Sequence, residues 1–368
     1  METFTIASLA VQIRGVSYKP EDLHSSLDDS SVILLRANNI DDGKINFDDV
    51  VFVDKKRVSN EQFLRKGDIL VCASSGSKNL VGKAASVDFD KEVTFGAFCK
   101  AVRPRNIEDA DYLAMFFQSP IYRCQIAATA IGANINNIRN EHVDTLSVKW
   151  PATVKRKEIV DILSKAGTII RKRKQQLSAL DDLIKARFVE MFGDPTQNEK
   201  GFETKQGSDV FKLSNGKFVP ESKRLDCGIP VYGGNGISWY TDDVLFEKDT
   251  IVVGRVGFQS GNVHLAKGTL WISDNAMYIS DFYDDGFDLK FLHAVMEHID
   301  FTRFQDAGDL KKITQKPFMQ MQFIRPPISL QRDYIAFVAQ IDKSKSAIQK
   351  SLDETQILFD SLMQKYFG

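Results

Sequence analysis

The chain has 368 residues, of which 43% are hydrophobic and 26% are charged, and its formal net charge is −1 at pH 7. This length exceeds one typical core and fits two domains, and the composition is ordinary for a soluble globular protein. The apolar runs are shorter than the roughly 20 residues of a membrane span, and the first residues lack the basic region and cleavage site of a secretory signal. The near-neutral charge argues against a strongly basic nucleic-acid-binding chain, so such a role would depend on local charge or on a partner.

The cysteines and histidines argue against a metal centre. The cysteines are widely spaced with no C-x-x-C pair, which predicts reduced thiols in a cytoplasmic protein and no zinc site. The histidines show neither H-E-x-x-H nor another ligand spacing. The residues concerned are Cys72, Cys99, Cys124 and Cys227, and His24, His142, His264, His293 and His298.

The first 150 residues are predicted to form a mixed globular domain, 1–150. β-Branched or alternating segments bounded by turn residues indicate strands. Apolar residues at helical spacing, with acids in the first turn, indicate a helix at 108–119. The predicted strands are 31–37, 50–54, 67–74 and 92–102.

A long helix is predicted at 151–193. Apolar residues recur there every three or four positions over about ten turns. Pro151 precedes the pattern, and Gly193 and Pro195 end it. At about 1.5 Å per residue the helix is roughly 55 Å long. A helix of this length needs a partner for its apolar stripe.

The remainder repeats this organisation, with a second globular domain at 194–328 and a second long helix at 329–368. Ser329 is the expected N-cap of that helix. The strands and the helix of the second domain are predicted at 249–256, 261–266, 269–280 and 288–299.

The two halves align with each other, which indicates an internal repeat. An offset of 175 residues aligns the two long helical segments without a gap, and both end in Phe-Gly. Offsets of 179 and 200 residues extend the match upstream. The aligned pairs include Ile138 with Ile313, Leu146 with Met321, Ala97 with Ala276, and Ile13 with Leu213.

We therefore predict an α/β (α+β) fold in which two similar globular domains are separated by two long antiparallel helices, related by a pseudo-two-fold internal repeat. The alternative is that each long helix is a linker packed on its own domain.

No catalytic signature stands out. The phosphate-binding G-x-x-x-x-G-K-[ST] is missing, and the glycine-rich segments 231–238 and 254–262 are interpreted as turns beside strands. The Pro-Pro pair at 326–327 lacks the Asn/Asp-Pro-Pro-aromatic context of an amino-methyltransferase. Asp309 and Lys311 form an Asp-x-Lys, as some nucleases do, but without a second acidic partner they are interpreted as a surface turn.

The polar loops offer the side chains that proteins use to read DNA. Arg, Lys, Asn and Gln pair with base edges, Ser and Lys contact phosphates, and Gly lets backbone approach closely. In the first half the candidates are Arg36, Asn38, Asn39, Ser74, Ser75, Ser77, Lys78, Asn79 and Lys83. In the second half they are Tyr232, Asn235, Trp239, Tyr240, Arg255, Gln259, Asn262, His264 and Lys267.

Three further segments carry the same chemistry. Segments 132–140 and 308–316 sit at equivalent places in the repeat and are rich in Asn, Lys and Arg. The basic run 171–174 lies within the first long helix, where it is either solvated or faces phosphates. Simple solvation is the alternative for all of these loops.

Taken as a set, these features resemble the specificity (S) subunit of type I restriction-modification systems. Segment 191–203, MFGDPTQNEKGFE, is similar to that family's link from the first spacer helix to the second target-recognition domain. Segments 65–77, 231–243 and 249–263 resemble its recognition-domain strands and loops. A departure is that ASSGS at 73–77 replaces the Arg-Val-Gly-like turn found at 255–257.

The resemblance implies that each domain reads one half of a two-part double-stranded DNA sequence and that the helix pair fixes the gap. It implies two methyltransferase (M) subunits as partners, which carry S-adenosylmethionine and flip the target adenine. It also implies restriction (R) subunits that use ATP and Mg for cleavage. The chain itself would hold no cofactor or metal and would catalyse nothing.

Three alternatives to this function remain. One is a stand-alone methyltransferase or nuclease. Another is a two-domain scaffold that does not bind DNA. The third is the specificity subunit of a related system in which methyltransferase and nuclease are fused in one partner.

Overall fold

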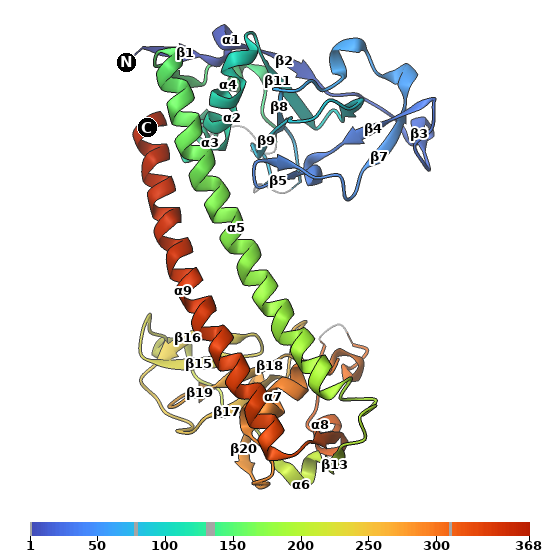
Figure 1. Ribbon diagram of the computed structural model, residues 1–368, viewed down its shortest axis with the longest axis vertical. Helices are drawn as coiled ribbons and strands as arrows, with labels where there is room; N and C mark the ends of the chain where they lie inside the picture. The colour runs from blue at the N-terminus through green and yellow to red at the C-terminus, as the bar shows by residue number, and fades with distance from the viewer. Residues whose placement is uncertain (1, 77–79, 130–136, 309–310) are drawn as a thin grey trace. The chain divides into compact units, whose positions relative to one another are not determined.

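The computed structural model describes residues 2–76, 80–129, 137–308 and 311–368 (Figure 1). They divide into two compact units. Unit 1 comprises Met1–Lys174 and Lys350–Gly368, and unit 2 comprises Gln175–Gln349. Each unit therefore holds a globular part and one half of each long helix. The long helices are α5 (Thr153–Phe192) and α9 (Ile328–Phe367).

Unit 1 contains two four-stranded sheets, of which the first is antiparallel and the second includes one parallel pair. The first sheet has the order β2 (Ala10–Arg14), β11 (Cys99–Pro104), β8 (Ile69–Cys72) and β9 (Ala84–Ser86). The second has the order β10 (Val93–Phe95), β4 (Ser31–Leu35), β7 (Val51–Asp54) and β3 (Leu23–His24). Two further pairs join β1 (Thr3–Thr5) to β12 (Ser147–Lys149) and β5 (Ile40–Asp41) to β6 (Lys44–Ile45).

Side chains of strand β8 lie in two different hydrophobic cores. Side chains alternate between the faces of a strand. Ile69 and Val71 therefore enter one buried cluster, and Leu70 and Cys72 enter another together with Phe95 of β10. The second cluster joins the two sheets, which explains why the predicted segment 67–74 is apolar at consecutive positions.

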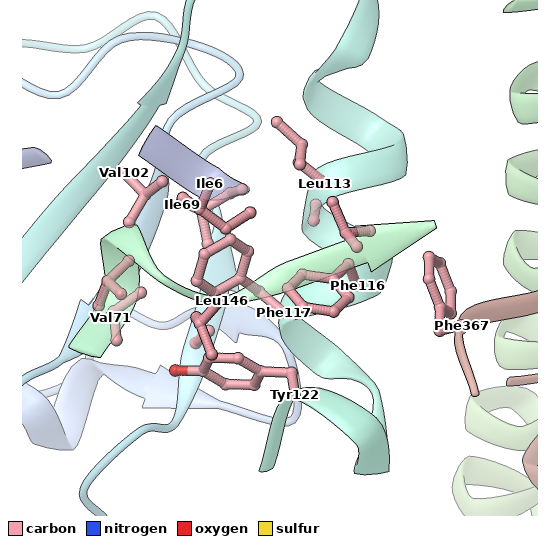
Figure 2. Packing of buried hydrophobic residues seen from close by; sticks show 14 of the residues in the cluster. Ile6, Ile69, Val71, Val102, Leu113, Phe116, Phe117, Tyr122, Leu146 and Phe367 are labelled. Atoms are coloured by element: carbon pink, nitrogen blue, oxygen red, sulfur yellow. The ribbon is translucent and has the colours of Figure 1, made fainter. Parts of the chain in front are cut away.

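The first of these cores also binds the long helices to unit 1. Met363 and Phe367 of α9 pack in it beside Ile159 of α5. The ring centroid of Phe367 lies 5.2 Å from that of Tyr112 and 6.0 Å from that of Phe116. Figure 2 labels Phe116 and Phe367 within this cluster. The aromatic partners belong to α2 (Ala110–Gln118), which is followed by α3 (Pro120–Thr129).

Unit 2 repeats this arrangement with its own elements. Its antiparallel sheet has the order β14 (Phe211–Asn215), β20 (Ala276–Phe282), β17 (Thr250–Gly254) and β18 (Val263–Ala266). Its second sheet has the order β16 (Gly236–Thr241), β15 (Ile229–Gly233) and β19 (Trp271–Ile272), with β15 parallel to β19. β13 (Glu203–Gln206) pairs with β21 (Gln322–Arg325), and α7 (Leu289–Glu297) corresponds to α2.

The core of unit 2 is closed by the same kind of aromatic contact. Phe192 at the end of α5 lies with its ring centroid 4.8 Å from that of Phe291 in α7 and 5.6 Å from that of Tyr334 in α9. Phe192 therefore holds unit 2 as Phe367 holds unit 1. The repeated Phe-Gly ending marks two equivalent core positions, and α5 and α9 run antiparallel where they pack within each unit.

Backbone hydrogen bonds confirm the repeat and correct part of its alignment. Ile138 donates to the carbonyl of Ala73, and Ile313 donates to that of Arg255, so the predicted Ile138–Ile313 pair is equivalent. Ile6 donates to Leu146, and Gly207 donates to Met321, which supports the Leu146–Met321 pair.

Two other aligned pairs were wrong by one or two residues. Ile13 pairs with Ala101 across two strands of unit 1, and Ser214 pairs with Tyr278 across the equivalent strands of unit 2. Ser214 is therefore the counterpart of Ile13, at an offset of 201 residues, and the predicted partner Leu213 lies one residue before it. Cys99 and Ala276 make equivalent turns, so Ala97 is not the partner of Ala276. Loops of different length in the two units shift the alignment between the halves at both of these positions.

Two predicted strands are each divided by a turn. Segment 92–102 forms β10 and β11, and segment 269–280 forms β19 and β20. The two strands of each pair belong to different sheets, so the chain must turn between them. Ser329 is not an N-cap, because α9 already begins at Ile328.

The remaining element predictions are close to the structure. The helices predicted at 108–119 and 288–299 are α2 and α7. The boundaries 1–150, 151–193, 194–328 and 329–368 describe the order of segments along the chain, and their assignment to separate tasks stays a prediction. No helix among the described residues is long and apolar enough to cross a membrane.

Asp288 is the N-cap of α7, and its removal is predicted to lower the stability of the protein. Its carboxylate accepts a hydrogen bond from the backbone N–H of Lys290 at 2.8 Å. Replacing an N-cap Asp by Ala costs about 1 kcal/mol. We expect Asp288→Ala to lower the free energy of unfolding by that amount in urea denaturation. Asp288→Asn should retain nearly all of it, since Asn is as good an N-cap; equal losses for both variants would contradict this role.

Candidate nucleic-acid interface

In unit 2, backbone hydrogen bonds join the hairpin loop between β17 and β18 to two neighbouring segments of the chain. The N–H groups of Arg255 and Val256 donate to the carbonyl of Asn275 at 2.9 and 3.3 Å. The N–H of Gly257 donates to the carbonyl of Lys311 at 2.8 Å. The loop is therefore a rigid platform on which side chains are presented at fixed positions.

Unit 1 builds the same platform from different residues. The N–H groups of Ala73 and Ser74 donate to the carbonyl of Phe98 at 2.8 and 2.9 Å, and Ser74 forms an antiparallel bridge with Asn137. Gly82 donates to Cys72 as Gly261 donates to Gly254, both at 2.8 Å. In each unit, a hairpin loop, the following inter-sheet turn and the segment near 137 or 312 thus meet at one end of the sheet.

Several residues predicted in unit 2 gather at this end. Arg255, Gln259 and Asn262 lie on the hairpin loop, and the Asn262 side-chain amide donates to the Gln259 amide oxygen at 2.6 Å. Asn235 is exposed in the tight turn joining β15 to β16. The Cβ position of the neighbouring Gly234 lies 3.4 Å from the Val256 carbonyl, which places this turn against the hairpin.

Most of the other predicted residues of unit 2 lie elsewhere. Lys267 follows the opposite end of β18 from the loop, because Ala266 pairs with Thr250. Trp239 and Tyr240 are half-buried and pair with Val231 and Pro230, away from the turn at Asn235. Tyr232 is half-buried on β15, and burial raises the pKa of its hydroxyl.

His264 was predicted as a DNA contact, and its surroundings do not suit that role. Its Nε2 atom is buried and has no hydrogen-bond partner among the described residues. Burial lowers the pKa of the imidazole, against a hydrogen bond from the ring to the backbone carbonyl of Gly234 that raises it. The ring lies beneath the 234–236 turn with its Nε2 atom buried, so it supports that turn, and His264 is not kept among the proposed DNA contacts.

In unit 1, Arg36 and Asn38 converge on one carboxylate. Arg36 Nη2 and Asn38 Nδ2 both donate to Asp49 Oδ2 at 2.9 Å. These two hydrogen bonds hold both side chains next to the 96–98 turn, because Gly96 donates to the carbonyl of Leu35. Arg36 and Asn38 therefore stay candidates.

Asn39 is corrected by the structure. It is 0% exposed, and its side-chain oxygen accepts a hydrogen bond from the backbone N–H of Arg36 at 2.8 Å. An Asn in this position stabilises the turn and cannot reach a base edge. Ser74, Ser75 and Lys83 are half-buried on or beside the hairpin. Ser77, Lys78 and Asn79, together with Asp309, lie outside the described residues.

A cation-rich groove of about 590 Å³ lies next to the hairpin of unit 1. Its basic side chains come from β6, the hairpin, α3 and α5, and the acidic residues among its described lining are Asp41 and Asp42. Two of the cations belong to the basic run 171–174. The basic residues are Lys44, Lys83, Arg123, Arg171 and Lys174.

Two phenylalanines beside the platforms were not among the predicted contacts, and two lysines there belong to the predicted segment 308–316. Phe98 and Phe258 are 71% and 89% exposed. Lys311 and Lys312 border the hairpin of unit 2. For Phe98 and Phe258 the sequence did carry a signal, because each is an aromatic residue in a glycine-containing turn. Among the described residues, no group of three or more His, Cys, Asp or Glu could hold a metal ion.

Comparison with known proteins identifies the family. The model of the type I restriction modification DNA specificity domain matches residues 36–179 and again residues 199–356. The chain belongs to this family. The specificity-domain match occurs twice, once in each half of the repeat, and it confirms the predicted family and the predicted two-domain organisation.

Two curated relatives and one solved structure extend this result. The chain is 36% identical over 183 residues to the type I restriction enzyme StySPI specificity subunit of Salmonella potsdam, covering 50% of this chain and 40% of that protein. It is 34% identical over 216 residues to the EcoKI specificity subunit of Escherichia coli K12, covering 57% and 46%. The chain thus spans less than half the length of the curated relatives it matches.

The solved structure supports the fold of this specificity-domain protein. The S subunit of a type I restriction-modification system from M. genitalium superposes with a TM-score of 0.63 at 16% identity, covering 100% of this chain and 96% of that chain. At this identity the likeness concerns the fold alone, and it confirms two globular domains with long helices packed together.

Proposed function

We propose that this chain is a specificity subunit that recognises a two-part sequence in double-stranded DNA and directs adenine methylation to it. The observation that carries the proposal is the repeated platform. Each unit presents one hairpin loop, one inter-sheet turn and one polar segment at the same end of its sheet, with Arg, Asn, Gln and Lys side chains among them. In this proposal each platform reads one half of the two-part sequence, because its side chains can pair with the donors and acceptors of base edges.

The proposed contacts differ between the units. In unit 1 they are Arg36, Asn38, Ser74, Ser75 and Lys83, and in unit 2 they are Asn235, Arg255, Gln259 and Asn262. Different side chains on equivalent backbones would read different bases, so the two half-sequences need not be related. Trp239, Tyr240 and Lys267 are supporting positions in this proposal, since they lie away from the hairpin end. Tyr232 lies next to the inter-sheet turn, because its carbonyl accepts a hydrogen bond from Ser273, and it stays a further candidate.

The proposed partners supply the chemistry. Two methyltransferase subunits would bring S-adenosylmethionine and flip the adenine, and restriction subunits would use ATP and Mg. In this proposal the chain contributes no catalytic residue and acts in the cytoplasm, where the DNA lies. Support comes from the curated relatives, which are named as subunits of restriction enzymes.

The proposal is tested by selection from a pool of random duplexes with the chain bound to its methyltransferase partner. We expect the retained duplexes to share two short conserved stretches separated by a gap of fixed length and free sequence. Retention of duplexes without any shared sequence would contradict the proposal.

The cation-rich groove gives a second prediction, on salt dependence. Each phosphate contact adds roughly 0.9 to the slope of log affinity against log salt. We expect Lys83→Gln combined with Lys174→Gln to reduce that slope by about 1 to 2 and to leave the selected bases unchanged. The control is Lys165→Gln in α5, because Lys165 is paired with Asp161 at 2.7 Å. An unchanged slope in the double variant would exclude the groove from the path of the DNA.

A further inference from the structure

Two phenylalanines stand out on the proposed DNA-facing ends because they are exposed where apolar rings are normally covered. Phe258 is 89% exposed at the tip of the β17–β18 loop, and Phe98 is 71% exposed in the turn between β10 and β11. Each ring forgoes the free energy that burial would provide. Phe218 is also 72% exposed, and singly exposed apolar side chains are common on protein surfaces. The case for a binding role of Phe258 and Phe98 therefore rests on their place on the two platforms.

The two rings belong to the same structural feature, although they are not at equivalent positions. The carbonyl of Phe98 accepts from Ala73 and Ser74 just as the carbonyl of Asn275 accepts from Arg255 and Val256. Phe98 thus corresponds to Asn275, and its ring stands beside the hairpin of unit 1. In unit 2 the ring comes from the hairpin itself. Each platform therefore carries one exposed phenylalanine by a different route.

The backbone around Phe258 keeps its ring extended from the surface. Gly257 has a φ of +93°, and no atom lies within 4 Å of the place where its Cβ would be. Ser260 donates to the carbonyl of Gly257 at 3.0 Å, and Gln305 Nε2 donates to that of Ser260 at 2.7 Å. The loop is anchored at its base while its tip meets open space.

Basic or amide residues lie near both rings in the sequence or in the fold. Arg255 and Gln259 are close to Phe258 in sequence, and the hairpin is bridged to Lys312. Phe98 lies beside the segment that contains Asn137. An apolar ring within a polar, basic rim suits nucleic acid, whose phosphates meet the cations while its stacked bases accept the ring. A protein-binding surface would instead need further apolar neighbours around the ring.

We propose that Phe258 and Phe98 are wedges, each inserting its ring at one base step of the half-sequence that its unit recognises. This inference rests on the proposed function and adds a mode of recognition to it. A wedge partly unstacks the step and kinks the duplex. The cost of that distortion depends on the step, so each ring would select bases that no hydrogen bond reads.

The experiment uses the full chain with its methyltransferase partner and duplexes that carry 2-aminopurine at successive positions of the recognised sequence. Unstacking raises the fluorescence of 2-aminopurine. Flipping of the target adenine by the partner raises the signal at that adenine in every variant, so the wedge is read at the other positions. With the natural chain, we expect a rise at one such position in each half. Phe258→Ala should abolish the rise in the half read by unit 2 alone and weaken selective binding roughly tenfold. Phe258→Trp should retain both, and Phe98→Ala should act on the other half.

The control is Tyr283→Ala, because Tyr283 is 57% exposed just beyond the opposite end of β20 from Asn275. It should change neither fluorescence nor affinity. Selective binding with no 2-aminopurine signal away from the flipped adenine would overturn the wedge and leave the proposed function standing. So would a signal at such a position that persists in Phe258→Ala. Loss of partner assembly without DNA in Phe258→Ala would overturn it too, assigning the ring to a protein contact. No selective binding by the natural chain would overturn both proposals.

Discussion

Adding four residues to each long helix is expected to abolish methylation of the natural sequence and to create a new one with the same bases and a longer gap. The insertions follow Lys174 in α5 and Gln349 in α9, where the chain passes between units 1 and 2. Contacts inside each unit, such as the ion pair of Lys345 with Asp181, then stay in place. Four helical residues add about 6 Å and rotate the chain by roughly 40°, so the gap should grow by about two base pairs.

This outcome follows from the proposal that the helices set the gap and the units set the bases. The readout is the pattern of methylated adenines in native DNA from cells that carry the lengthened chain. A same-length control, Gln176→Ala in α5, should keep the natural pattern. Changed bases at an unchanged gap would contradict the proposal, because the helices would then act on recognition itself.

Removing the two long polar side chains of the unit 2 hairpin is expected to weaken selective DNA binding about 100-fold. A good pairing with a base edge contributes about 1 to 3 kcal/mol, so Arg255→Ala with Gln259→Ala should remove roughly 3 kcal/mol in total. Binding to unrelated DNA depends on phosphate contacts and should hardly change. Competition between specific and random duplexes measures the ratio directly.

The matched control for the hairpin variant is Lys267→Ala. Lys267 follows the same two-stranded ribbon at its opposite end, so its removal should leave the selected bases unchanged. If Lys267→Ala weakened selective binding more than the Arg255 and Gln259 double variant, the DNA would lie at the end of the ribbon opposite the loop. That result would contradict the proposed interface. Relaxed selection confined to one half of the sequence is the signature we expect from the hairpin variant.

The repeat and the long helices could be predicted from the sequence because they depend on local patterns. Apolar residues recur at helical spacing throughout α5 and α9, and Phe192 and Phe367 end equivalent segments. The alignment failed where loop lengths differ, as at Leu213, since a single inserted residue changes which face a strand side chain takes.

The candidate site was less predictable because it depends on which loops meet. The sequence shows that Asn39 and His264 are polar, but only the fold shows that one is buried in a turn and that the other has an enclosed Nε2 atom. Phe98 was hidden inside a segment predicted as one strand. The turn that exposes it arises because β10 and β11 pair in different sheets.

The central claim is tested most directly by mapping adenine methylation in native DNA from cells with and without this gene. The account predicts one two-part motif, two short conserved stretches around a fixed gap, that is methylated only when the gene is present. Identical methylation in both strains, with the partner methyltransferase expressed and active, would contradict it and favour a scaffold that does not bind DNA.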